Sequence, residues 1–247
     1  MNDVQSMTSA PRGLDLLWGA PPRGARGPAA RYTIGDIASA AVRLADADGL
    51  DAVTLAAVAR ELALTTTALY RYVDTKPVLI EVMTDAAIGL APRVPGRTWQ
   101  ARARAWALAL AARYRAHPWL AAVQPAGMPR CPQLYAWLDV LVSAVDGTPA
   151  EPGTPDAPGV DALRLGLLLD AVIRGYVDLG VDPAPPPGWL VEGISTRHPR
   201  LAARLARDWS DTERELTHAI DVVLAGAAAT PQPEEGRRGA RRRTRAE

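Results

Sequence analysis

The sequence predicts an all-α protein with a three-helix N-terminal unit followed by a larger helical domain. Apolar residues recur at helical spacing through most of the chain, and several of these runs begin with a threonine or an aspartate in an N-cap position. We find no segment with the two-residue alternation of a strand. With 247 residues, of which 48% are hydrophobic, the chain is long enough to bury a sizeable core.

The first 30 residues are rich in glycine, proline, alanine and arginine. Despite the short apolar patch Leu14–Gly19, we interpret residues 1–30 as a flexible basic arm. The first helix is expected to begin after Thr33, because "TIGD" has the spacing of a capping box with Asp36 as the partner. Gly49 is typical of the position just past a helix C-terminus, so it should end this helix.

Two further short helices and a longer one follow. Thr54 is a typical N-cap for the second helix, and the third should begin at Thr65 or Thr66 after a tight turn. The fourth should begin near Pro77, since proline is favoured in the first turn of a helix. Two short helices joined by a tight turn, over about residues 54–73, predict a helix-turn-helix.

The remaining sequence is also helical in pattern. The expected helices cover residues 98–117, 132–145, 160–179, 199–209 and, from the capping box "SDTE" at 210–213, a last segment to about 227. The helix at 160–179 is apolar around much of its circumference, which predicts burial on more than one side. We interpret residues 91–230 as one domain and residues 231–247, which contain six arginines, as a disordered Arg-rich tail.

Bulk charge does not indicate a nucleic-acid partner. The net charge is +1, and residues 1–90 carry 8 basic and 10 acidic side chains. A role in DNA binding would therefore depend on where individual cations lie. Lys76 is the only lysine in the chain, and it directly precedes Pro77 at the expected start of the fourth helix.

The composition argues against several other classes of protein. A single cysteine, Cys131, excludes an intramolecular disulfide, and no apolar run approaches the ~18 residues of a membrane span. The N-terminus lacks the apolar core of a signal peptide, so we expect a cytoplasmic protein with no membrane partner. With three histidines and no spacing typical of a metal site, a nucleophile elbow or a phosphate loop, we expect no enzyme activity, no cofactor and no metal.

The stretch "TLAAVARELALTTTALYRYVDTKPVLIEVM" resembles the DNA-binding headpiece of the TetR family of bacterial repressors, over about residues 31–90. The segment "ALAARYRAHPWLA" resembles the tetracycline-repressor-like subset of actinobacterial regulators. The resemblance implies a double-stranded DNA operator as partner, with base or groove contacts from Thr66, Thr67, Ala68, Tyr70, Arg71 and Tyr72. It also implies phosphate contacts from Thr54 and Lys76. Thr67 stands where the family often has glycine or proline, which leaves the operator sequence open.

Physical chemistry agrees with part of this assignment. A recognition helix presents its N-terminal residues to the major groove, and Arg71 could bond the edge of a guanine through two hydrogen bonds. Tyr70 and Tyr72 have an alternative role, which is to cover the small core of the headpiece. The arginines before the first helix could follow the DNA backbone or enter the minor groove, or they could simply keep a disordered arm soluble.

A single headpiece offers too little surface to select an operator, so we expect a homodimer that binds two half-sites. Helices 160–179 and 211–227, paired with those of a second copy, would form a four-helix bundle, although the first could also be the central core helix. The resemblance implies that residues 91–230 bind a small hydrophobic or aromatic effector as well as forming the dimer. The candidate lining residues are Trp106, His117, Trp137, Arg174 and Tyr176, for which an aromatic core is the alternative.

Together these inferences favour a DNA-binding transcriptional regulator, and within that class an effector-released repressor that binds a palindromic operator as a dimer. Two alternatives remain open. One is an effector-independent DNA-binding or structural protein on the same fold, and the other is an activator that recruits polymerase. DNA retardation with and without small metabolites would separate the repressor from the structural protein.

Overall fold

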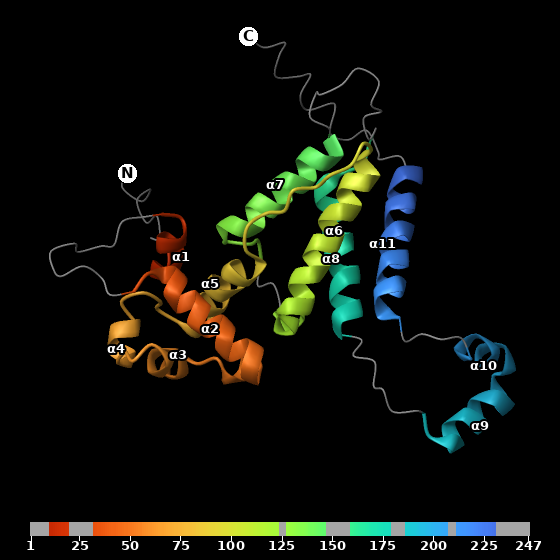
Figure 1. Ribbon diagram of the computed structural model, residues 1–247, viewed down its shortest axis with the longest axis horizontal. Helices are drawn as coiled ribbons and strands as arrows, with labels where there is room; N and C mark the ends of the chain where they lie inside the picture. Colours follow the sequence, from red (N-terminus) through yellow and green to blue (C-terminus); the bar gives the residue numbers. More distant parts are fainter. Residues whose placement is uncertain are drawn as a thin grey trace, which may run out of the picture.

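The computed structural model describes residues 10–19, 32–123, 127–146, 159–178, 186–206 and 211–230. Over these residues the chain forms eleven α-helices and two short 3₁₀ helices, with no β-strand (Figure 1). The all-α prediction is therefore confirmed. Helices α1 to α5 gather at one end of the molecule, and α6, α7, α8 and α11 form a bundle beside them. Arg23, Arg26 and Arg31, which precede the first expected helix, and the tail 231–247 lie outside the described residues.

The N-terminal unit, residues 32–90, is here called the headpiece. It contains α2 (Ile34–Asp48), the 3₁₀ helix η1 (Leu50–Ala52), α3 (Leu55–Glu61), α4 (Thr66–Leu69) and α5 (Lys76–Ile88). Each of these α-helices begins with a threonine whose hydroxyl accepts a backbone N–H of the first turn, at Thr33, Thr54, Thr65 and Thr75. The capping box is confirmed, because the Thr33 N–H also donates to Asp36 Oδ2 at 2.7 Å. Gly49 ends α2 with a φ of 82°, a conformation that glycine adopts without steric cost.

The prediction that residues 1–30 form a flexible arm is wrong for α1 (Arg12–Leu17). Leu14 is 2% exposed and belongs to the core of the headpiece. Gly13 packs so closely on α5 that a Cβ atom there would lie 2.8 Å from Val78 Cγ1. The apolar patch in this part of the sequence folds because it buries a leucine, and that burial offsets the entropy cost of ordering the helix.

The C-terminal domain is a bundle of long helices. It contains α6 (Trp99–Ala116), the 3₁₀ helix η2 (Pro118–Ala122), α7 (Pro132–Asp146), α8 (Ala162–Asp178) and α11 (Thr212–Ala229). Helix α6 packs against α7, α8 and α11, and α11 also packs against α8. Trp106, Leu141, Leu169 and Ile220 are buried in the core that these helices share. The long helices predicted in these four regions are thus confirmed to within a few residues.

Two details of the C-terminal half differ from the sequence-based predictions. The pattern does not predict α9 (Gly188–Arg197), which contacts α10 (Pro199–Leu205), and neither helix has a buried residue. The capping box predicted at 210–213 is wrong, because Asp211 is the N-cap of α11 and its carboxylate accepts the Arg214 N–H at 2.9 Å. Aspartate caps a helix as well as serine does, so α11 begins one residue later than predicted.

Helix α8 is buried on one side in the single chain, whereas its composition predicts burial on more than one. Leu165 and Leu169 are buried in the bundle, but Leu163, Leu167 and Leu168 are exposed. We call these three exposed leucines the α8 face. A helix that is apolar around its circumference needs an apolar neighbour on each side, and within one copy of the chain this face has none among the described residues.

Asp85 on α5 is buried and serves as the cap of another helix. Its carboxylate accepts the Gln133 N–H at the start of α7, at 2.8 Å. Burial raises the pKa of Asp85, and the hydrogen bond from Gln133 opposes that rise. The pKa of Asp85 is therefore higher in the folded protein than in the unfolded chain. As the pH rises from the unfolded pKa through the folded pKa, the free energy of unfolding falls, because the buried carboxyl group must ionise.

An Asp85→Asn variant is expected to match or exceed the wild type in free energy of unfolding near neutral pH. The amide oxygen can still accept the Gln133 N–H, and no charge is buried. Asp85→Ala should lose about 1–3 kcal/mol, since it leaves that N–H without an acceptor. Urea denaturation near neutral pH and in mild acid measures both effects, and any advantage of the asparagine variant should shrink in acid. Equal losses in the two variants at neutral pH would contradict this account.

Candidate nucleic-acid interface

A tight turn joins α3 to α4 and sets the angle between them. Ala63 has a φ of 50°, in the left-handed region that non-glycine residues rarely adopt. The Leu64 N–H donates to the Ala59 carbonyl at 2.8 Å, which is the pattern of a Schellman C-cap. The Tyr32 hydroxyl donates to the Leu62 carbonyl in the same turn at 2.8 Å. The turn predicted between the two helices is confirmed, and these bonds hold α4 in a defined orientation on α3.

The N-terminal end of α4 is exposed. Thr65 is the N-cap, and its hydroxyl accepts the Ala68 N–H at 3.1 Å. Thr66 and Thr67 therefore lie in the first turn with exposed side chains, while Leu69 is fully buried in the headpiece core. The two exposed threonines offer hydroxyls that donate or accept and methyl groups that can contact thymine.

The residues that follow α4 divide between the surface and the core. Tyr70 is 47% exposed, and Arg71 is exposed. Tyr72 is half-buried against the headpiece core, and Val73 is fully buried. Of the two tyrosines, Tyr70 is therefore better placed to reach a DNA backbone, and Tyr72 also covers the core, as the alternative interpretation expects.

Thr54 and Lys76 are exposed at the starts of α3 and α5. The Thr54 hydroxyl caps its own helix with a hydrogen bond of 3.0 Å, and Lys76 directly follows the Thr75 N-cap. No ion pair in the described part of the chain includes Lys76 or Arg71. Helix N-termini favour anions, so cations beside them could neutralise phosphates without breaking an existing ion pair.

Residues 37–83, which include α3, α4 and the first part of α5, match the family model of the bacterial regulatory proteins of the tetR family. The headpiece therefore carries a DNA-binding domain of the tetR-family type. This match agrees with the resemblance that the sequence shows over about residues 31–90. The helix-turn-helix lies within the matched residues.

Two relatives of this chain are described as HTH-type transcriptional regulators. The chain is 38% identical over 112 residues to the HTH-type transcriptional repressor DrrR1 of Streptomyces coeruleorubidus, a match that covers 44% of this chain and 42% of that protein. It is 27% identical over 199 residues to an HTH-type transcriptional regulator of Saccharopolyspora erythraea, covering 78% of this chain and 84% of that protein. The chain thus spans less than half of the first relative and most of the second.

Solved structures of TetR-family proteins share the fold. ActR of Streptomyces coelicolor in complex with (S)-DNPA has a TM-score of 0.63 at 20% identity, over 81% of this chain and 98% of that chain. The transcriptional regulator SCO7222 of the same organism has a TM-score of 0.57 at 25% identity, over 78% of this chain and 96% of that chain. The matched family and the curated relatives are transcriptional regulators, in agreement with the sequence-based expectation of no enzyme activity.

Besides the bond between Gln133 and Asp85, hydrogen bonds around Asp46 and Trp137 join the headpiece to the C-terminal domain. Asp46 Oδ1, near the end of α2, lies 2.8 Å from His117 Nδ1 and 2.7 Å from Trp119 Nε1. Trp137 on α7 donates its indole N–H to the Gly89 carbonyl, just after α5, at 2.9 Å. No local pattern identifies Asp46, because its partners lie 71 and 73 residues further along the chain.

The five residues predicted to line an effector pocket fall into separate groups. Trp106 and Trp137 pack edge to face with ring centroids 6.0 Å apart, and the Trp106 indole N–H donates to the Trp137 carbonyl at 2.8 Å. His117 precedes η2, and Arg174 donates to backbone carbonyls in and just after η2, at 3.0 and 2.9 Å. Tyr176 is half-buried against the core. A shallow depression between α6 and α11 is lined by none of the five.

A partly buried polar network lies between α6 and α8. The Tyr114 hydroxyl donates to Asp170 Oδ1 at 2.7 Å. Arg174 donates to Asp170 Oδ2 at 2.8 Å and lies over the Tyr114 ring, 5.1 Å from its centroid. Burial raises the pKa of Tyr114, so its hydroxyl stays protonated and acts as the donor. The sequence offers one signal for this network, the four-residue spacing of Asp170 and Arg174 on a predicted helix.

Cys131 is not placed to react as a thiolate. Its buried thiol donates to the Glu81 carbonyl at 3.3 Å, and burial raises the pKa of Cys131 to about 12, so the thiol is protonated near neutral pH. Within the described ranges, histidine, cysteine, aspartate and glutamate side chains form no group of three that could hold a metal ion. No described helix combines the length and apolarity needed to cross a membrane.

Proposed function

We propose that this protein is a repressor that binds a palindromic operator as a homodimer and is released from it by a small hydrophobic or aromatic effector. The observation that carries the proposal is the start of α4, where Thr66 and Thr67 are exposed and Arg71 follows on the surface. The proposal assigns DNA binding to residues 31–90, and effector binding and dimerisation to residues 91–230.

In the proposed complex, α4 enters the major groove with its N-terminal end leading. The side chains that read bases are Thr66, Thr67, Ala68 and Arg71. Those that fix the helix on the duplex are Thr54, Tyr70 and Lys76, with a smaller share from the half-buried Tyr72. Their exposure and the absence of ion pairs at Arg71 and Lys76 within the described residues support these roles.

The homodimer is proposed to form through α8 and α11. The α8 face is unpartnered among the described residues of one chain, and Val222 on the neighbouring α11 is 56% exposed. Pairing these two helices with their symmetry mates would bury the apolar surface in a four-helix bundle. A dimer also carries two recognition helices, which matches the two halves of a palindromic operator.

Effector release is proposed to act through the contacts between the two domains. Trp137 packs on Trp106 inside the bundle and also bonds the carbonyl that follows α5. A ligand that displaced α7 would therefore also displace α5, the last helix of the headpiece. This would shift the population toward a dimer with misplaced recognition helices. ActR, which has the same fold, has been solved with (S)-DNPA and with actinorhodin, and the relative DrrR1 is described as a repressor.

Footprinting of the DNA upstream of the gene for this protein tests the proposal. The expected result is one protected site with two-fold symmetry, and loss of protection when a small aromatic ligand is added. Protection that no ligand changes would favour an effector-independent DNA-binding protein. Transcription that rises on addition of the protein to a reconstituted system would favour an activator.

An Arg71→Ala variant is expected to lose about 1–3 kcal/mol of discrimination at one base pair of each half-site, since it removes a two-bond contact to a guanine edge. Affinity for random DNA should change little. Fluorescence anisotropy on a set of operator variants measures both quantities. A uniform loss of affinity for every sequence would show that Arg71 contacts a phosphate instead.

A further inference from the structure

Helix α1 bonds the headpiece at its first residue. The Arg12 backbone N–H donates to Asp74 Oδ2 at 2.8 Å, and the Arg12 guanidinium donates to the Tyr70 carbonyl at 3.3 Å. Both acceptors lie in the segment that joins α4, the proposed recognition helix, to α5. The start of α1 therefore holds the segment that directly follows the recognition helix.

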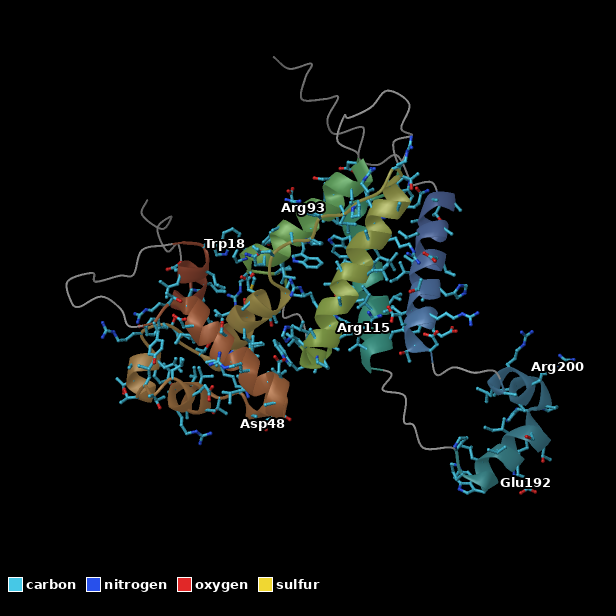
Figure 2. The ribbon with its side chains drawn as sticks, viewed as in Figure 1. Trp18, Asp48, Arg93, Arg115, Glu192 and Arg200 are labelled. Carbon is cyan, nitrogen blue, oxygen red and sulfur yellow. The ribbon has the colours of Figure 1, made fainter. Side chains whose placement is uncertain are left out.

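The other end of α1 bonds the C-terminal domain. The Trp18 indole N–H donates to the Arg130 carbonyl at 2.8 Å, and the Trp18 ring lies 6.0 Å from the ring of Tyr135 on α7. Figure 2 shows Trp18 between α1 and the start of α7. Arg130 is itself paired with Glu81 of α5, through Nε to Oε2 at 3.0 Å and a second bond from its terminal nitrogen. The Trp18 end of α1 is thus docked where α5 meets the segment before α7.

The middle of α1 is tightly packed against the headpiece. Leu14 is buried, and the space beside Gly13 is too small for a Cβ atom, with Tyr72 O at 3.4 Å and Val82 Cγ2 at 3.3 Å from that position. A six-residue helix spans about 9 Å and is not stable in isolation. Its helical structure therefore depends on the two domains that it touches.

We propose that α1 is a strap that fixes the recognition helix relative to the C-terminal domain, with Trp18 as a positioning residue for operator binding. The proposal rests on the proposed function, because it concerns the spacing of recognition helices in a DNA-bound dimer. A headpiece that α1 tethers to the C-terminal domain samples fewer orientations before it binds, so less conformational entropy is lost on the operator. Without the strap, the headpiece would remain folded but would be held to α7 by fewer contacts.

The test compares full-length wild type, Trp18→Ala, Trp18→Phe and the control Trp189→Ala. Trp189, on α9, is 74% exposed and distant in the chain from both ends of α1, so its loss removes a tryptophan without touching the strap. Amide hydrogen exchange is measured over residues 66–75 and 127–135, together with the melting temperature and the affinity for the footprinted operator. Trp18→Phe keeps a ring against Tyr135 but removes the donor to Arg130.

In Trp18→Ala we expect exchange in both segments to rise by about tenfold and operator affinity to fall by about three- to tenfold, at an unchanged melting temperature. Trp18 is 58% exposed, so its loss should not unfold the core. Trp18→Phe should fall between Trp18→Ala and the wild type, and Trp189→Ala should match the wild type.

Three results would contradict the proposal that α1 is a strap. They are unchanged exchange over 127–135 in Trp18→Ala, unchanged operator affinity in that variant, and uniformly faster exchange with a lower melting temperature. If the wild type itself protects no DNA, the proposed function fails, and the exchange measurement alone then decides whether α1 joins the two domains.

Discussion

A Leu167→Glu variant is expected to be monomeric and to lose at least roughly 100-fold in affinity for an operator with two half-sites. Leu167 is 73% exposed at the centre of the α8 face, so the substitution leaves the folded single chain intact. In the proposed dimer it would bury a carboxylate near the symmetry axis, and that cost opposes association. Sedimentation velocity measures the oligomeric state, and retardation of the footprinted operator measures the affinity.

The matched control is Leu201→Glu on α10. Leu201 is an exposed leucine as well, at 50%, but it lies outside the proposed four-helix bundle. The Leu201→Glu protein should remain dimeric and bind the operator with wild-type affinity. A Leu167→Glu protein that stayed dimeric would place the dimer interface somewhere other than α8, and a monomer with full operator affinity would exclude the dimeric mode of binding.

Removing Lys76 and Tyr70 together should weaken operator binding by roughly 10- to 100-fold, while the melting temperature and the dimer stay nearly unchanged. Both side chains are exposed and contribute little to the core, so the loss should appear in DNA binding rather than in folding. Each dimer would lose two lysine–phosphate contacts, and the slope of log affinity against log salt should fall in magnitude by about 1.8. Anisotropy titrations over a range of salt concentrations measure that slope for Lys76→Ala, Tyr70→Ala and the double variant.

Arg93→Ala serves as the charge control, because Arg93 is an exposed cation beyond the headpiece (Figure 2). Its salt slope should equal that of the wild type. Tyr70→Ala alone should lower affinity with little change in slope. If Lys76→Ala leaves the slope unchanged, the lysine is an ordinary solvated side chain, and if it lowers the melting temperature in parallel with affinity, its role is structural.

Local signals were sufficient to predict the headpiece helices. The N-caps at Thr33 and Thr54 each bond a backbone N–H three residues away, so their effect is contained in a few letters of sequence. The burial of Leu69 and Val73 also follows from spacing on the helix-turn-helix. The same periodicity places Thr66, Thr67 and Arg71 on the solvent-exposed face. The candidate DNA surface was predictable for that reason.

Local signals failed where a distant partner decides the outcome. The patch around Leu14 has the composition of a mobile arm, and it becomes a helix because α5 supplies an apolar surface for it. The predicted effector residues illustrate the same limit. Helical spacing placed Trp106 and Trp137 inside the bundle, but it could not tell that they pack on each other while Arg174 bonds the carbonyls of η2.

The sequence by itself therefore determined the starts of the headpiece helices α2 to α5, the helix-turn-helix and the polar face of α4, because capping and periodicity act over three or four residues. Only the tertiary structure decided how the two domains are joined. The bonds from Arg12 to Asp74 and from Trp18 to Arg130 span 62 and 112 residues, and the bond between Asp46 and His117 spans 71. Contacts at such separations depend on how whole helices pack, and no periodicity along the chain encodes them.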